Sequence, residues 1–243
     1  MEPTRLNKYF SICGFCSRRE ADRLIAKGQV LVNGRQAEAG MKVTEADEVV
    51  VNGQRILPKD ETVVLAFHKP RGIVCTTSAK DRAQNVIEYI QYPIRVYPVG
   101  RLDKESEGLL LLTNDGELMN RILRSRYHHE KEYVVQVDKP VTEAFLKQMS
   151  SGVPILDTVT RPCQVKKIDS YRFSIILTQG LNRQIRRMCE YLGYQVLELK
   201  RVRILNIDLG NLQSGALRKL EGAELQKLYD LTAEEHPAKE SEL

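Results

Sequence analysis

Two apolar runs near the start of the chain each end in the same turn signal. Val30–Val32 is followed by Asn33-Gly34, and Val49–Val51 is followed by Asn52-Gly53. Asn-Gly accepts the positive φ angles that tight hairpin turns require, so each run predicts a strand that leads into a turn.

A helix is predicted just before these strands. Ser17 and Glu20 have the spacing of a capping box, and Gly28 is suited to end a helix ten residues later. We therefore expect a helix over 18–27, with Arg19, Arg23 and Lys27 recurring every fourth residue along one face. Like charges at this spacing weaken an isolated helix, whereas a bound phosphate backbone would make them favourable. A merely soluble helix face is the alternative.

Short apolar runs alternate with turns through the rest of the chain. The polar, proline-broken stretch 57–61 reads as a linker, and strand character resumes at Thr62. The apolar residues 96–99 end at Gly100, and the leucines 109–112 end at Asn114-Asp115-Gly116, which predicts two strands. An α+β organisation follows, with domains over 4–56 and 62–231 and a disordered tail over 232–243.

A second basic helix is predicted late in the sequence. Residues 182–193 read as a capped helix whose buried stripe is Ile185, Met188, Cys189 and Leu192. Arg183, Arg186 and Arg187 occupy the opposing positions. Downstream, Lys200, Arg201 and Arg203 extend this basic surface, with Val202 and Ile204 alternating inward. Such guanidinium groups can hold phosphates or pair with carboxylates.

Charge is unevenly distributed along the 243 residues. The formal net charge is +5, and residues 4–36 alone carry seven basic residues against two acidic ones. The first module is therefore the expected contact for a polyanion. The apolar runs are too short to cross a bilayer and the amino terminus is charged, so we expect a cytoplasmic protein. No heptad pattern is present, which favours a monomer.

Five scattered cysteines give no disulfide framework. Cys13 and Cys16 have the spacing of a redox or zinc pair, but no second pair follows and the four histidines form no ligand pattern. We therefore expect reduced thiols and no metal site.

Asp103 is the candidate catalytic group. It lies in a charged loop between the two predicted strands, where a carboxylate can act as nucleophile, base or metal ligand. A solvated surface pair with Arg101 is the alternative. Glu105 and Glu107 alternate with it along one loop, which supports a Mg²⁺ nuclease poorly, and the chain has no glycine-rich loop typical of a methyltransferase cofactor. Tyr133 opens another predicted strand, where its ring can face the core or a cleft.

Two resemblances connect these segments. Residues 4–52 resemble an S4 RNA-binding domain through 5–9, 16–21 and 28–34. From about Val63 to Leu228 the chain resembles the RsuA-type pseudouridine synthases, and within them the RluF group. The motifs that carry this likeness are His68-Lys69-Pro70-Arg71-Gly72, 100–109, Lys131-Glu132-Tyr133 and 180–188, with 129–133 and 152–156 favouring the RluF group.

The resemblance implies a small S4-like module followed by a mixed, mainly antiparallel sheet flanked by helices. It implies isomerisation of a uridine in structured RNA by base flipping, without cofactor or metal. The family analogy favours 23S ribosomal RNA as the substrate and leaves open a transfer-RNA anticodon stem-loop, on which some members also act. Asp103 would be the nucleophile or base, acting at the sugar or at the base ring. Arg186 would pair with it and keep it charged, and Tyr133 would stack on the uracil and help remove the C5 proton.

Arg101 would fill the space left by the flipped base or hold a phosphate. The expected RNA contacts are Arg5, Lys8, Arg18, Arg19, Arg23, Lys27, Arg101, Arg183, Arg187 and Arg201. The competing hypothesis is a non-catalytic S4-domain RNA-binding or ribosome-associated protein. Asp103 with Arg186 disfavours it, because a carboxylate among cations repels phosphate.

Overall fold

The computed structural model describes residues 3–58, 61–75, 84–124 and 127–233. The chain forms two compact units: Met1–Val63 with Tyr92–Val96 and Asn114–Gly116, and Val64–Gln91 with Tyr97–Thr113 and Glu117–Leu243. Within the described ranges, no helix is both long and apolar enough to cross a membrane.

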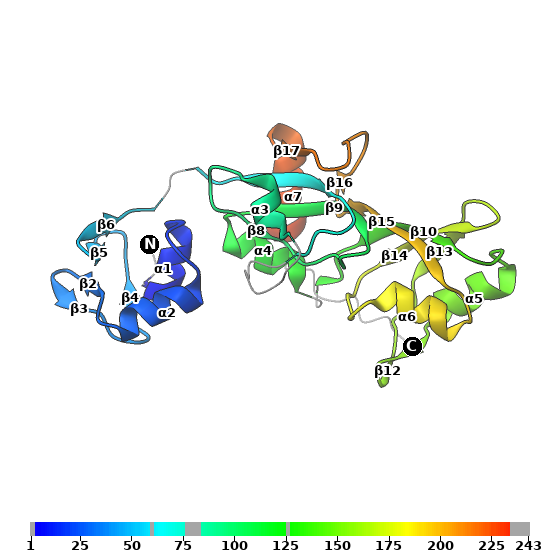
Figure 1. Cartoon of the computed structure of the whole chain (residues 1–243), viewed down its shortest axis with the longest axis horizontal. Helices are drawn as coiled ribbons and strands as arrows, with labels where there is room; N and C mark the ends of the chain where they lie inside the picture. Colours follow the sequence, from blue (N-terminus) through cyan, green and yellow to red (C-terminus); the bar gives the residue numbers. More distant parts are fainter. Residues whose placement is uncertain (1–2, 59–60, 76–83, 125–126, 234–243) are drawn as a thin grey trace. The chain divides into compact units, whose positions relative to one another are not determined.

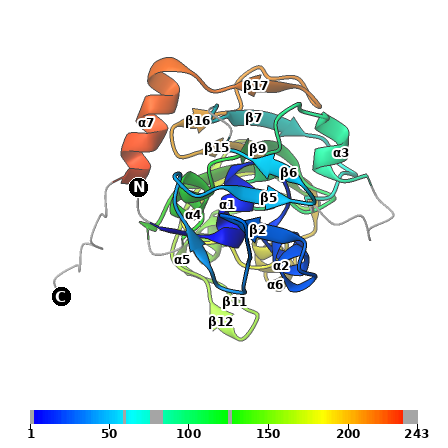
Figure 2. The same cartoon turned by 90° about the vertical axis from the view of Figure 1, so that its left-hand side faces the viewer.

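The first unit packs two helices on a small antiparallel sheet (Figure 1). Its elements are β1 (Thr4–Arg5), α1 (Leu6–Ile12), α2 (Arg18–Ala26), β2 (Val30–Val32), β3 (Arg35–Gln36), β4 (Lys42–Val43), β5 (Val49–Val51) and β6 (Gln54–Ile56). The sheet has the strand order β3-β2-β5-β6, and β1 pairs separately with β4. Figure 2 views the strands from the side opposite the helices. Alternate residues of β2 and β5 are buried against α1 and α2, which places the core of this unit between the two layers.

The local signals in this unit act as predicted. Ser17 Oγ accepts a hydrogen bond from Glu20 N at 3.2 Å, so α2 has the first half of the capping box. The Glu20 carboxylate instead accepts from Arg23 Nη1 at 2.9 Å. Gly28, with φ of +69°, follows the end of the helix. Both Asn-Gly pairs have positive φ at both residues and close the hairpins β2–β3 and β5–β6.

The second unit is built on one mixed sheet. The strands of this sheet are β7 (Val64–Lys69), β8 (Tyr97–Pro98), β9 (Glu107–Thr113), β10 (Lys131–Val137), β13 (Gln164–Lys167), β14 (Arg172–Leu177), β15 (Val196–Ile204), β16 (Ile207–Asp208) and β17 (Leu217–Lys219). Strands β11 (Pro154–Ile155) and β12 (Thr158–Val159) pair with each other in a separate two-stranded sheet. The order is β13-β14-β10-β15-β9-β7-β17, and neighbours are antiparallel except for β15 and β9. The predicted mixed, mainly antiparallel sheet is therefore confirmed.

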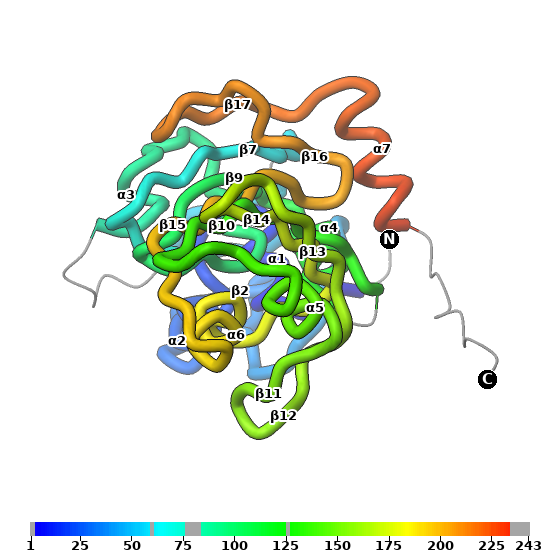
Figure 3. Tube along the Cα trace, turned by 90° about the vertical axis from the view of Figure 1, so that its right-hand side faces the viewer, coloured from blue at the N-terminus to red at the C-terminus, as the bar shows by residue number. Residues whose placement is uncertain are grey.

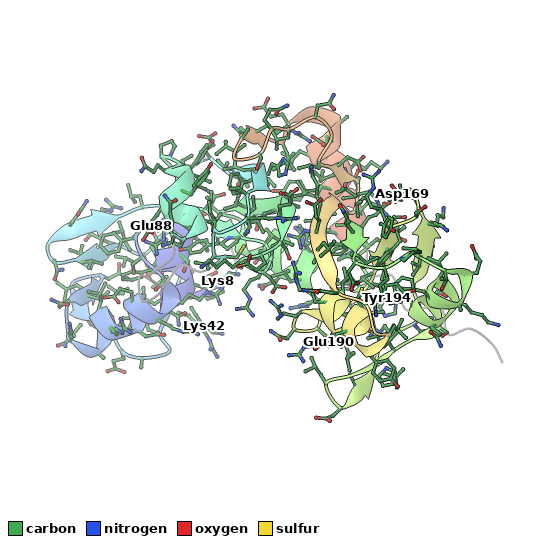
Figure 4. All side chains as sticks on the ribbon, turned by 45° about the vertical axis from the view of Figure 1, so that its right-hand side comes forward. Lys8, Lys42, Glu88, Asp169, Glu190 and Tyr194 are labelled. Atoms are coloured by element: carbon green, nitrogen blue, oxygen red, sulfur yellow. The ribbon has the colours of Figure 1, made fainter. Side chains whose placement is uncertain are left out.

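Helices cover both halves of this sheet. They are α3 (Val86–Ile90), α4 (Gly116–Leu123), α5 (Glu143–Ser151), α6 (Gln184–Tyr191) and α7 (Gly222–Ala233). Residues of α5 and α6 share a core with β10 and β14, and Figure 3 shows both helices on the same side of these strands. Tyr194, labelled in Figure 4, stacks on Phe145 with ring centroids 4.2 Å apart and ties the segment after α6 to α5. Residues of α4 and α7 share a second core with β7 and β9.

The position of β7 and β9 in the middle of the sheet explains why their sequences contain long apolar runs without alternation. Every residue of β7 is buried, and so is every residue of β9 after Glu107. A strand with neighbours on both edges and packing on both faces has no solvent side, so it shows no alternation. The predicted strand over 109–112 is confirmed and extends over 107–113.

Two expectations about helix ends are wrong. Helix α6 has no side-chain cap: its first cap residue, Arg183, adopts a left-handed conformation, and Gln184 Oε1 accepts from Leu181 N at 3.0 Å. The predicted tail does not begin at Thr232, because α7 continues to Ala233. Thr232 is buried and donates from Oγ1 to Leu228 O at 2.8 Å. Residues 234–243 lie outside the described part of the chain.

Candidate active site

The loop that carries Asp103 is fixed at several points between β8 and β9. Leu102 is buried, and its N–H donates to Cys75 Sγ at 3.4 Å. Gly72 N donates to Lys104 O at 2.8 Å, and Ser106 N donates to Asp103 O at 3.1 Å. The loop backbone is therefore held against the second unit, and it presents the Asp103 side chain, which is 30% exposed.

A buried lysine at the end of β7 donates hydrogen bonds that hold this loop. Lys69 ends β7 and is 0% exposed. Its Nζ donates to Pro70 O and to Ser106 O, both at 2.8 Å. Burial lowers the pKa of Lys69, while Cys75 and Asp103 act in the opposite direction. A charged donor that binds two carbonyl groups fixes the end of the Asp103 loop onto β7.

Arg186 reaches the same loop from α6. Its Nη2 donates to Glu105 O at 3.2 Å and to Ser106 Oγ at 3.3 Å. Its Nε has no hydrogen-bond partner and lies 4.0 Å from Asp103 Oδ2. Arg183 Nη1 lies at the same distance from this oxygen. The sequence prediction that Arg186 and Asp103 come together is confirmed, although 4.0 Å is an ion pair without a direct hydrogen bond.

The surroundings of Arg186 are strongly cationic. Burial lowers the pKa of Arg186, the neighbouring Arg183 lowers it further, and Asp103 partly opposes both. The guanidinium stays protonated at any physiological pH because an ordinary arginine titrates far above it. Asp103 therefore faces two permanent positive charges.

A cavity of about 570 Å³ opens beside Asp103. This is within the range of small-ligand sites, so it has room for a nucleobase. Its walls come from the Asp103 loop, the start of β10, the end of β14, the turn before α6 and the middle of β15. Six cationic side chains and one acidic side chain line it: Arg101, Lys104, Arg124, Lys131, Arg183, Arg201 and Asp103.

Tyr133 lies in the cavity wall, and its neighbour on the adjacent strand is Arg201. It stands on β10 directly across from Arg201 on β15, whose Cζ is 6.0 Å from the ring centroid. Arg201 is 3% exposed and donates from Nε to Leu109 O at 2.7 Å. The prediction that Arg201 extends an outer basic surface is therefore wrong.

A β-bulge explains the error. Glu132 pairs with Arg203 and Tyr133 pairs with Arg201, which leaves Val202 without a partner on β10. The extra residue reverses the alternation of side chains, so Arg201 and Arg203 do not share a face. Arg203 is held instead by Glu130 and Glu132, at 2.9 and 3.0 Å.

Of the other predicted RNA contacts, Arg101 and Arg183 line the cavity and the rest lie outside it. Arg101 is exposed at the cavity, and Arg187 is bonded to Asn182 O and Oδ1. In the first unit, Arg23 pairs with Glu20, and Figure 4 labels Lys8 on α1 and Lys42 on β4. Among the predicted contacts in this unit, the exposed ones are Arg5, Arg18, Arg19, Arg23 and Lys27, whereas Lys8 is half-buried. Their part in RNA binding stays a prediction.

The cysteines are free thiols. Burial raises the pKa of both Cys13 and Cys16 to about 11, so neither is reactive at neutral pH. Among the residues with described positions, no group of three His, Cys, Asp or Glu side chains is arranged to hold a metal ion.

Sequence reasoning missed Lys69, Ser106 and Lys131 as parts of the site. Lys69 had a signal, since a lysine that ends a run of buried strand residues needs a specific acceptor. Lys131 had a weaker one, because it stands two residues before Tyr133 and so shares its side of the strand.

Comparison with known proteins identifies the family of this chain. Residues 63–191, more than half of the chain, match the family described as RNA pseudouridylate synthase. This chain belongs to that family. Residues 4–49 match the S4 domain. The chain is an RNA pseudouridine synthase, an isomerase, which decides against the non-catalytic alternative.

Similar proteins support this membership. Dual-specificity RNA pseudouridine synthase RluF of Salmonella typhi is 52% identical over 230 residues, which cover 94% of this chain and 79% of the relative. Ribosomal large subunit pseudouridine synthase B of Bacillus subtilis is 35% identical, with coverage of 93% and 96%. A solved structure of a pseudouridylate synthase aligns with a TM-score of 0.69 at 28% identity, covering 93% of this chain and 99% of that one. The resemblance to RsuA-type enzymes of the RluF group is thus confirmed.

Proposed function

We propose that this synthase isomerises a specific uridine of 23S ribosomal RNA, and a second uridine in a transfer-RNA anticodon stem-loop, with Asp103 as its catalytic carboxylate. The observation that supports the site is that Asp103 lines a cavity with room for a nucleobase and lies 4.0 Å from Arg183 and Arg186. The names of the similar enzymes support the substrates, since one is called dual-specificity and another is named for the large ribosomal subunit.

In this proposal the target uracil turns out of its RNA stack into the cavity. The C1′–N1 bond breaks and a C1′–C5 bond forms. C5 loses its proton and N1 gains one, so substrate and product are isomers. Asp103 acts on the sugar or on the ring with the two guanidinium groups facing its carboxylate, and Tyr133 stacks on the base and helps to remove the C5 proton.

Contacts to the RNA backbone supply the energy to flip the base, which is on the order of a few kcal/mol. The exposed cations of α2 and those at the cavity rim have the charge for this purpose. The enzyme acts on structured RNA as a monomer in this scheme.

The test of the catalytic role is Asp103→Asn, which keeps the shape of the side chain but removes its charge. We expect turnover of a ribosomal RNA fragment to fall by about 10³-fold or more, with RNA affinity nearly unchanged. Asp230→Asn is the matched control, because Asp230 is an exposed residue of α7 outside the cavity. Turnover of Asp103→Asn near that of wild type would refute the role.

The test of the substrate is transcriptome-wide mapping of pseudouridine in cells with and without the gene. We expect one position in 23S ribosomal RNA and one in a transfer-RNA anticodon stem-loop to lose the modification. An unchanged ribosomal RNA profile would contradict the proposed target while leaving the enzyme class intact.

A further inference from the structure

Two of the cations that line the cavity, the half-buried Lys131 and the buried Arg201, have no acidic partner among the described residues. Lys131 and Arg201 both line the cavity, and neither lies within ion-pair distance of an Asp or Glu oxygen in the described parts of the chain. Asp103, the acidic side chain of the cavity, is instead paired with Arg183 and Arg186. Charges that are largely removed from water normally have counter-ions, so these two require an explanation.

The position of Arg201 is fixed by the sheet. Its Nε donates to Leu109 O on β9, and its guanidinium lies beside the ring of Tyr133. Gly108 makes this approach possible, because a Cβ on that residue would collide with the backbone of Arg201. The Nη2 atom is buried and has no hydrogen-bond partner. The fold therefore holds an unused cationic donor next to the proposed stacking ring.

Lys131 adds a second charge on the same side. It stands two residues before Tyr133 on β10, so both side chains leave the same face of the strand. Its Nζ donates to His129 O at a long 3.3 Å. Burial, and then the charge of Arg201, lowers the pKa of Lys131 to about 8. An anion placed between the two cations would relieve both effects.

The reaction generates such an anion when Asp103 acts at the sugar, and this inference takes that route. When the C1′–N1 bond breaks, its electron pair leaves with the base. C1′ is then short of an electron pair, which it regains in one of two ways. Either the Asp103 carboxylate forms a bond to C1′, or the C2′ proton moves to Asp103 and a C1′–C2′ double bond forms. In both cases the detached uracil carries one negative charge, spread over N1, O2 and O4.

We propose that Lys131 and Arg201 bind the detached uracil anion while it turns to present C5 to C1′. The two residues are then catalytic groups that stabilise developing charge, as preorganised donors do in oxyanion sites. This inference rests on the proposed function, because it requires the target uracil to enter this cavity. Binding of an RNA phosphate by Arg201 is the competing role, but at 3% exposure its guanidinium is far less accessible than exposed Arg101.

The test compares two leaving groups under single-turnover conditions. One RNA fragment carries uridine at the target position and the other carries 5-fluorouridine, whose fluorine withdraws electrons and stabilises the uracil anion. Fluorine on C5 cannot leave as a proton, so loss of the N-linked nucleoside is measured by nuclease digestion and mass spectrometry. The variants are Lys131→Met and Arg201→Met, with Lys131→Arg and Arg201→Lys as charge-keeping partners. Lys166→Met, at an exposed position of β13, is the control.

Removing either charge is expected to slow the uridine reaction by about 10²-fold or more, as in other anion-stabilising sites. The loss with 5-fluorouridine should be at least about tenfold smaller, because its anion needs less stabilisation. The charge-keeping variants should recover most of the rate, and RNA affinity should not change. If Arg201→Met does not fold, Lys131→Met carries the comparison alone.

Equal slowing of the two substrates would overturn this inference. Weaker RNA binding with an unchanged rate at saturating RNA would also overturn it, and would indicate a phosphate contact. Activity of Asp103→Asn near that of wild type would instead contradict the proposed function itself.

Discussion

The partly buried ammonium group of Lys131 makes the folded protein less stable at neutral pH than a neutral side chain would. Burial and the neighbouring Arg201 lower the pKa of Lys131 from 10.5 to about 8. At about 1.4 kcal/mol for each pH unit, this lowering costs the fold about 3 kcal/mol. Replacing Lys131 by methionine, which fills similar space without charge, is therefore expected to raise the free energy of unfolding by about 2–3 kcal/mol at pH 7.

The stability gained by Lys131→Met is expected to decrease as the pH rises. Below pH 8 the lysine is protonated in both the folded and the unfolded chain, so the full cost is present. Between about 8 and 10.5 the folded protein loses the proton first, and the cost shrinks as pH rises. The advantage of Lys131→Met should therefore disappear by about pH 10.5. Arg201, His129, Tyr133 and Asp103 are present in both proteins, so their own titration largely cancels in the difference.

Urea unfolding followed by circular dichroism at several pH values measures this difference. Lys166→Met serves as the control at an exposed site, and we expect its effect to stay within about 0.5 kcal/mol. If Lys131→Met were no more stable than wild type at pH 7, the charge would not be held at a cost. A gain that stayed constant from pH 8 to 10.5 would show that packing, and not charge, accounts for it.

Two further predictions concern the sheet and the first unit. Gly108→Ala should lower the free energy of unfolding by at least about 2 kcal/mol and impair activity, because φ is +109° and the added Cβ meets the backbone of Arg201. Gly116→Ala should have neither effect, because the space around its new Cβ is open. Equal losses of stability for the two variants in thermal unfolding would refute the close-approach argument. Arg19→Ala with Arg23→Ala should weaken RNA binding and reduce its salt slope by about 1 for each RNA phosphate that the variant no longer neutralises, without altering the rate at saturating RNA. An unchanged slope in filter binding would show that α2 does not carry the electrostatic interaction.

The parts of the fold that could be predicted are those with local causes. The Asn33-Gly34 turn needs only residues that accept positive φ, and α2 needs only the Ser17 cap and Gly28. The meeting of Asp103 and Arg186 is different, because the two residues lie on separate elements. It followed from the resemblance of the motifs, and the distance of 4.0 Å confirms it.

The burial of Arg201 could not be predicted, since its causes are distant in the sequence. Its Nε acceptor, Leu109 O, lies 92 residues away. The bulge at Val202 and the parallel pairing with Gly108 appear only once β15 has been placed between β9 and β10. Alternation alone assigned the strand to the surface, where basic residues are usually found.

The distribution of charge within the cavity separates two tasks. Asp103 influences the pKa of Arg186 and of Lys69, but the charge that acts on Lys131 is that of Arg201. A carboxylate beside Lys131 would remove its cost to the fold, yet it would repel a detached uracil anion. The fold can hold these two cations without an acidic partner because they stand in the middle of the sheet. The surrounding strands β9, β10 and β15 are each hydrogen-bonded to a neighbour on both edges. In the proposed mechanism, the negative charge of the departing base would offset part of this cost at the moment the anion forms.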